Sequence, residues 1–260
     1  MAATKDGSTT LEGTPNPEAP NPQLPIVQKL RLRYAKRGRM RLTRHRAVGR
    51  AYDRAWRRSG LQGGFSSGCT PHPKISYAGA SPTGAASEAE FLEIGLTRTL
   101  DPAEVQRTLN ESLPAGLDII DVVGSPGGPL ADLLQASNWK IQLPEVQVED
   151  AKAAVSKFLD LEEVIVERMM KRGLRSINTR AAVIRLAVEE DTDEDGYAIL
   201  DLVVRHDTPS VRPDDVITGL RNLCGLPIEK APLATRSSQG PLDEQTGSVG
   251  DPLATGRDAP

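Results

Sequence analysis

Residues 27–60 read VQKLRLRYAKRGRMRLTRHRAVGRAYDRAWRRSG, and this stretch decides the fold because its two parts have different periods. From Val27 to Tyr34 apolar and basic residues alternate, which is the period-2 pattern of a β-strand with one basic face. From about His45 to Arg58 the apolar residues recur with helical spacing, and Ser59-Gly60 ends the segment. The ordered part of the chain therefore begins with a strand and an amphipathic helix.

The residues that follow complete one unit of mixed α and β structure. We expect strands at about Ile75–Ala80, Glu90–Leu96 and Leu117–Val123, and a helix at Pro102–Ser112. The resulting order, β-α-β-β-α-β, is that of the split βαβ, ferredoxin-like arrangement. We assign residues 26–124 to this basic subdomain.

A second unit follows the Gly- and Pro-rich segment 124–129, which is typical of an inter-domain linker. Its predicted elements are strand 139–143, helix 148–159, strand 163–169, a hairpin of 181–188 and 198–204, and helix 212–223. Residues 125–228 therefore form a second predicted subdomain of the same kind. The expected fold class is α+β, with two tandem ferredoxin-like (split βαβ) subdomains.

The two ends of the chain differ from these units in composition. Residues 1–25 and 229–260 are rich in Pro, Gly, Ser and Thr and poor in large apolar side chains. Such segments bury too little surface to offset the entropy of ordering them. We therefore expect both ends to be disordered tails.

Charge is concentrated in one segment. Residues 28–58 hold thirteen Lys or Arg residues and one acid, Asp53, a net charge of +12 within a chain whose total is −3. The remaining residues must then carry −15. A local excess of this kind indicates a polyanionic partner, although charge runs more often mean a solvated face.

The helix predicted at 45–58 arranges part of this charge in a row. At 100° per residue, Arg46, Arg50, Arg54 and Arg57 fall within an arc of about 80°, opposite Val48, Ala51, Tyr52, Ala55 and Trp56. Guanidinium groups match phosphate oxygens in geometry and keep their charge. The predicted nucleic-acid-binding residues are Arg31, Arg33, Arg44, Arg46, Arg50, Arg54, Arg57, Gly68 and Lys74.

The Gly- and Ser-rich loop 63–74 is a second expected contact, because its backbone N–H groups can face a phosphate. It holds His72 between two prolines, and His45 begins the helix. Two imidazoles beside a phosphate can act as general base and general acid in RNA cleavage. His45 and His72 are therefore candidate catalytic residues, while the alternative is that both are structural.

Several function classes are disfavoured. The sequence contains neither a long apolar run for membrane insertion nor an N-terminal secretory signal, so we expect a cytoplasmic protein without membrane contact. Cys69 and Cys224 lie far apart in sequence, and Asp191–Gly196 resembles a calcium loop but has Leu202 at the twelfth position. We expect no bound metal, no cofactor and no sequence-specific DNA-binding motif.

Several stretches resemble one bacterial family. They are Leu30–Lys36, Leu42–His45, Arg50–Gly60, Phe65–Ser76, Pro82–Gly84 and Glu88–Glu93. The family is the radical-SAM-linked domain of unknown function, and the resemblance covers roughly residues 28–228. It implies work beside a radical SAM enzyme, although this chain lacks the three-cysteine motif for that enzyme's iron–sulfur cluster. The element order also resembles the tandem ferredoxin-like RNA-processing proteins of CRISPR systems, an analogy of fold alone.

These observations favour an RNA-binding accessory protein that presents RNA to a modifying or processing enzyme supplied by another chain. Two other classes stay open: a metal-independent endoribonuclease using His45 and His72, and a protein-interaction adaptor for a radical SAM enzyme. The three function classes differ in where they require His45, His72 and the arginines of the predicted helix to lie in the fold.

Overall fold

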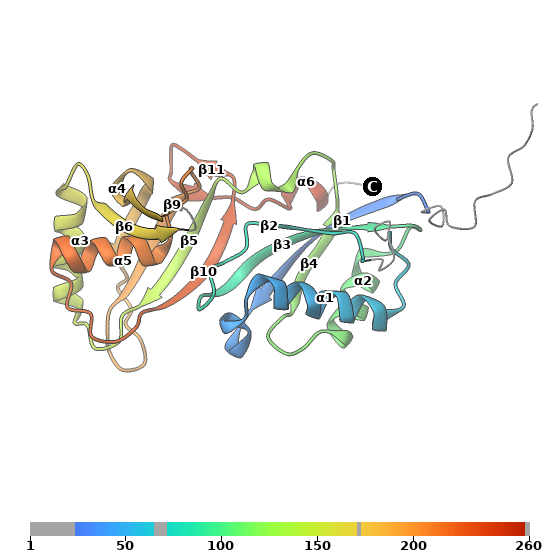
Figure 1. Ribbon diagram of the computed structural model, residues 1–260, viewed down its shortest axis with the longest axis horizontal. Coiled ribbons are helices and arrows are strands. Elements are labelled where there is room, and N and C mark those ends of the chain that lie inside the picture. The colour runs from blue at the N-terminus through green and yellow to red at the C-terminus, as the bar shows by residue number, and fades with distance from the viewer. Residues whose placement is uncertain (1–23, 65–71, 171–172, 258–260) are drawn as a thin grey trace, which may run out of the picture.

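The computed structural model describes residues 24–64, 72–170 and 173–257, and it confirms the α+β class. Its main feature is one mixed sheet of eight strands, seven of them in the order β4-β1-β3-β10-β5-β9-β8, with β2 also pairing with β3. The strands are β1 (Gln28–Lys36), β2 (Ile75–Ala78), β3 (Ala86–Leu96), β4 (Ile119–Gly124), β5 (Ala136–Gln142), β8 (Val183–Val188), β9 (Ile199–Arg205) and β10 (Leu233–Gly240). Figure 1 shows the sheet running along the length of the molecule.

The first half of the sheet carries two helices, α1 (His45–Ser59) and α2 (Pro102–Ser112), on one face (Figure 1). Leu30, Leu32 and Tyr34 of β1 point to that face and share a core with the buried side of α1. Asp101 caps α2, because its side chain accepts a hydrogen bond from the Ala103 amide. The strand order within this half is β4-β1-β3-β2, and each of these neighbouring pairs is antiparallel.

The other face of the first half is covered by segments from far along the chain. The 3₁₀ helix η2 (Leu130–Leu133) and the short α6 (Ala254–Arg257) lie there. Phe91 and Val123 of the sheet pack against Leu130, Leu134 and Leu253 in a smaller core. A further 3₁₀ helix, η1 (Gly38–Leu42), connects β1 to α1.

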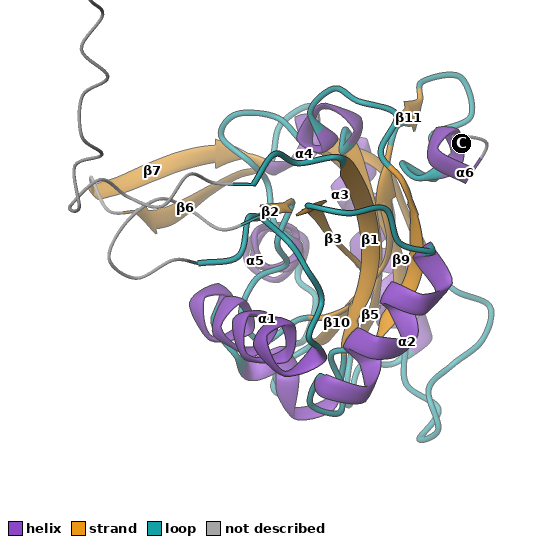
Figure 2. Ribbon diagram, turned by 90° about the vertical axis from the view of Figure 1, so that its right-hand side faces the viewer, coloured by secondary structure: helices purple, strands orange, loops and turns teal. Residues whose placement is uncertain are grey.

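The second half has helices α3 (Val148–Asp160) and α5 (Pro213–Cys224), which contribute Phe158 and Leu220 to its core. Its strand order is β10-β5-β9-β8, again with antiparallel neighbours. Between α3 and β8 lie the short α4 (Thr179–Ala182) and a separate ribbon of β6 (Ile165–Met170) and β7 (Gly173–Asn178). Figure 2 shows this ribbon extending away from the body.

The expectation of a disordered tail over 229–260 is wrong as far as residue 257. β10 lies inside the sheet, parallel to β3 and antiparallel to β5, and is followed by the hairpin β11 (Leu242–Asp243) and β12 (Ser248–Val249). The sequence LATRSSQG lacks apolar alternation because its buried members include Arg236 and Gln239, whose polar groups are satisfied by distant partners. Most of the other predicted tail, 1–23, lies outside the described residues.

The predicted boundary near residue 124 does not separate two sheets. β10 pairs with β3 of the first half and β5 of the second, so one sheet runs through both. The segment read as a linker is also held in place, since the Arg31 guanidinium donates to the carbonyls of Gly127 and Gly128, each at 2.7 Å. Polar contacts to backbone, which composition does not reveal, fix this Gly-rich stretch.

Candidate nucleic-acid interface

The outer side of α1 presents a row of arginines to solvent. Arg46, Arg50 and Arg54 are exposed, while Val48, Ala51, Tyr52, Ala55 and Trp56 on the opposite side are buried, as the helical periodicity predicts. Successive members of the row are four residues apart, or about 6 Å along the helix axis. Within the described parts of the chain, none of the three forms an ion pair. We call Arg46, Arg50 and Arg54 the arginine row.

Neighbouring cations extend this surface. Arg44, the N-cap of α1, and Arg39 of η1 are exposed, and Arg41 is half-buried. Arg57 is exposed at the far end of α1 and has an interaction partner. No acid stands in the first turn of α1 or of η1. The surface formed by η1 and the first turns of α1 is therefore electropositive.

Other cations of the 28–58 segment serve the fold. Lys36 is buried and donates to the carbonyls of Ser81, at 3.5 Å, and Pro82, at 3.1 Å. Burial lowers the pKa of its ammonium group. Arg37 pairs with Glu88 and Asp118. The +12 of the sequence therefore overstates the charge available to a ligand.

Two predicted binding residues lie on the wrong face of the sheet. Successive side chains of a strand point to opposite faces, so Arg31 and Arg33 point away from the side on which α1 packs. Arg31 is 1% exposed, and its Nε donates to Glu93 at 3.2 Å. Arg33 is half-buried. We therefore place neither on the surface of α1. On their side of β1 the Arg31 guanidinium is bound by Glu93 and by the carbonyls of Gly127 and Gly128.

The loop 63–74 begins and ends against α1. Gly63 packs on the Trp56 ring, so closely that a Cβ there would lie 2.0 Å from Cζ2. His72 is exposed, and its Nδ1 lies 3.3 Å from the Asp53 carboxylate of α1. Lys74 is exposed, and its role in binding stays a prediction. Gly68 and Cys69 fall outside the described residues, so the loop's proposed phosphate contacts there stay predictions.

The structure does not bring His45 and His72 together. His45 is exposed at the start of α1, with its ring edge-on to Tyr77 at a centroid distance of 5.0 Å. His72 pairs with Asp53, eight residues further, which is about 12 Å along the helix. A general acid and base must both reach one phosphodiester group, and this separation does not favour that arrangement.

His45 instead shares a cavity with the third histidine, His206. The cavity has a volume of about 650 Å³ and lies between the two halves of the molecule. Its lining includes Trp139 of β5, Arg212 before α5 and Arg236 of β10. This cleft could not be predicted from sequence patterns, because it is assembled from segments that lie up to 191 residues apart in the chain.

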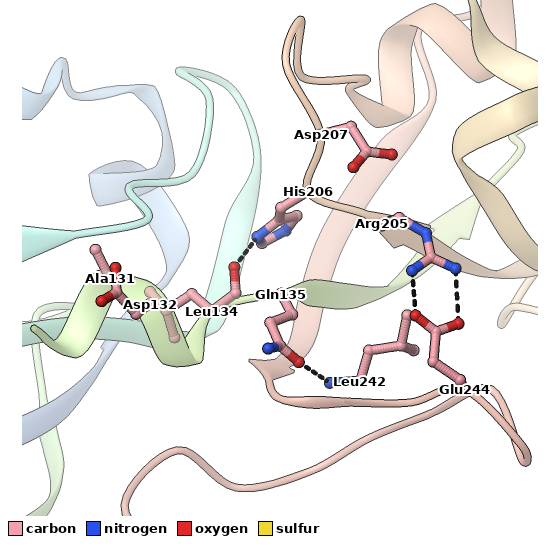
Figure 3. A pocket seen from close by; sticks show the side chains of 9 residues that line it. All are labelled: Ala131, Asp132, Leu134, Gln135, Arg205, His206, Asp207, Leu242 and Glu244. Atoms are coloured by element: carbon pink, nitrogen blue, oxygen red, sulfur yellow. Dashed lines mark hydrogen bonds and ion pairs between the residues drawn. The ribbon is translucent and has the colours of Figure 1, made fainter.

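His206 is held by a chain of hydrogen bonds. Trp139 Nε1 donates to Ser137 Oγ at 2.8 Å, and Ser137 Oγ lies 2.9 Å from His206 Nε2. His206 Nδ1 lies 2.8 Å from the Leu134 carbonyl, a contact that Figure 3 shows beside Gln135 and the Arg205–Glu244 pair. Nδ1 donates to this carbonyl, and burial lowers the pKa of the ring, which favours its neutral form. Both ring nitrogens are occupied, so His206 is a structural wall of the cleft.

Fold and site together define an α+β protein with an arginine-lined helix and a cleft between its halves. Among the described residues no helix is long and apolar enough to cross a membrane, and no cluster of three metal-ligating side chains occurs. The chain belongs to a family described as uncharacterized proteins conserved in bacteria (DUF2344), whose model matches residues 29–213. The predicted membership in a bacterial family of unknown function is thus confirmed. No curated protein matches the chain.

Proposed function

We propose that the protein binds RNA through the arginine row and presents it to a modifying or processing enzyme on another chain. The single observation that supports this most is the exposure of Arg46, Arg50 and Arg54 without ion-pair partners among the described residues. Guanidinium groups at a regular spacing suit a phosphate backbone better than they suit any isolated anion. Such contacts position a nucleic acid without reading its sequence.

The two halves of the fold repeat one strand order, and this repetition supports the proposal. We infer that each half is a split βαβ unit, because the strand orders β4-β1-β3-β2 and β10-β5-β9-β8 correspond position by position. In this reading the β6–β7 ribbon is an insertion in the second unit, and β10 is its fourth strand. The first unit carries the basic helix, and the second, more acidic one is free to contact the enzyme.

The experiment is fluorescence anisotropy of labelled structured and single-stranded RNA with the full chain. The test variant is Arg46→Ala, Arg50→Ala, Arg54→Ala. A charge-matched control replaces Arg98, Arg107 and Arg221, which are exposed elsewhere. We expect affinity to fall at least tenfold in the test variant, about 1.4 kcal/mol, and to change little in the control. Equal losses in both variants would mean that net charge alone, with no localised site, attracts RNA.

A second candidate function rests on the β6–β7 ribbon. Met169 and Leu174 on this ribbon are 73% and 55% exposed, and Ile165 is 45% exposed. A two-stranded ribbon with apolar side chains in water is typical of a docking arm. We propose as the alternative an adaptor that binds a radical SAM enzyme here. The adaptor would be favoured if such an enzyme copurifies with the wild type in the absence of nucleic acid. The double variant Met169→Ser, Leu174→Ser should then lose the enzyme.

A further inference from the structure

The cleft between the two halves has a distinct floor and rim. Its floor is formed by the buried side chains of Ser137, Trp139 and Arg236, and its rim by the exposed His45, Thr83 and Arg212. Binding sites for small molecules usually enclose about 300–1,000 Å³, and this cleft has about 650 Å³. The space is therefore suited to a ligand larger than a simple ion.

The cleft continues the arginine row. His45 is the first residue of α1 and lies between Arg44 and Arg46, so the same helix turn contributes to the row and to the rim. Figure 1 shows α1 starting near the middle of the molecule and running away from the second half. A strand whose backbone followed the row toward the start of α1 would reach the cleft.

The lining combines three kinds of group. The hydroxyls of Ser81 and Ser210 can pair with polar edges, and Pro82, Val211 and Pro213 offer apolar surface. The rim has a guanidinium group at Arg212 and an imidazole at His45, and the carboxylate of Asp214 also lines the cleft. An aromatic ring with polar edges suits the interior, while a phosphate suits Arg212 at the rim.

Further charges at the cleft are already compensated. Arg236 forms an ion pair with Glu90, and Lys36 is bound to the carbonyls of Ser81 and Pro82. These groups shape the floor and the β2–β3 turn, and they leave Arg212 as the exposed guanidinium of the lining. One cation and an acid, Asp214, do not make a strong site for a bare anion, so binding must draw on the apolar and hydroxyl surface.

We propose that this cleft binds a single nucleotide, with the base inside it and the phosphate at Arg212. The inference deepens the proposed function, on which it rests for the route along α1, and makes the ligand an unstacked nucleotide of the bound RNA. His206 contributes a fixed wall, because both its ring nitrogens are hydrogen-bonded.

The test is equilibrium dialysis of the full chain against the four ribonucleoside 5′-monophosphates, the matching nucleosides and inorganic phosphate. We expect at least one monophosphate to bind with a dissociation constant of about 1 mM or tighter, and inorganic phosphate to bind more weakly. Arg212→Ala should weaken monophosphate binding about tenfold, which is the loss expected for one charge-assisted contact, and Arg221→Ala on α5 should not. Thr83→Trp at the rim should block the cleft, whereas Thr99→Trp, exposed elsewhere, should leave binding intact.

The outcomes separate the two proposals. If no monophosphate binds, or if inorganic phosphate binds equally well, the nucleotide cleft is refuted even when the arginine row binds RNA. If a monophosphate binds and responds to Arg212→Ala and Thr83→Trp, the cleft is supported even when replacement of the row leaves RNA binding unchanged. Monophosphate binding that ignores both cleft variants would place the ligand elsewhere and refute the assignment.

Discussion

Replacing Arg236 with Met tests how the C-terminal strand is held in the sheet. Arg236 lies in β10, and its guanidinium forms a buried ion pair with Glu90 of β3. It also donates to Ser87 Oγ at 3.3 Å and to Gln239 Oε1 at 3.1 Å, and it lies 5.4 Å from the centre of the Trp139 ring. The Arg236 and Glu90 side chains are 4% and 3% exposed, so water cannot replace either partner.

The expected loss follows from that burial. Burial alone would raise the pKa of Glu90, but Arg236, together with Ser87 and the amide of Ser81, lowers it. Arg236→Met removes the main compensating charge and leaves a carboxyl group without its partner. Breaking a buried pair in this way costs about 3–5 kcal/mol, out of a typical total stability of about 5–15 kcal/mol. Glu90→Gln in the same chain removes the orphaned charge, so the double variant should recover much of the loss.

The assay is urea unfolding followed by circular dichroism at neutral pH for the wild type, Arg236→Met and the double variant. The reasoning predicts a marked fall in midpoint for the single variant and a partial recovery in the double. A loss below about 1 kcal/mol would be that of an exposed pair and would refute the buried geometry. A double variant no more stable than the single one would refute the assignment of the loss to Glu90.

Three further predictions concern the same framework. A chain that ends at Lys230 lacks β10, and we expect no cooperative thermal transition by circular dichroism; a full-length-like transition would contradict the sheet order. Gly63→Ala places a methyl group against Trp56, so chemical denaturation should show a loss of about 1–3 kcal/mol, and an unchanged midpoint would oppose that packing. Because burial lowers the pKa of His206, the unfolded state binds its proton more readily, and stability should fall as pH drops below about 6.5 toward the folded pKa. His206→Gln should flatten that part of the stability profile, and identical profiles for both proteins would contradict it.

The first half of the fold was largely predictable from sequence. The change from period 2 to helical period placed β1 and α1, and the faces of α1 follow from its apolar spacing. The exposed positions of Arg46, Arg50 and Arg54 could be predicted because α1 has only one buried side, and the arginines lie opposite it. Periodicity works at these places because local geometry and burial agree.

The remainder depends on contacts between distant segments. β10 escaped prediction because Arg236 and Gln239 are buried through partners about 150 residues away, and polar residues in a Pro- and Ser-rich stretch indicate a loop. Arg31 appeared to belong to a basic surface because alternation does not show which face of a strand other segments will cover. His206 joined His45 in the cleft only through the pairing of β5 with β9 and β10.

The most direct test of RNA binding by the arginine row is the salt dependence of that binding. Affinity for one structured RNA is measured across a series of salt concentrations for the wild type and for Arg46→Ala, Arg50→Ala, Arg54→Ala. Three lost phosphate contacts should reduce the slope of log affinity against log salt by about 2–3. That reduction, with a steep slope in the wild type, is the predicted result. Equal slopes, or no binding by the wild type at low salt, would contradict the proposed function.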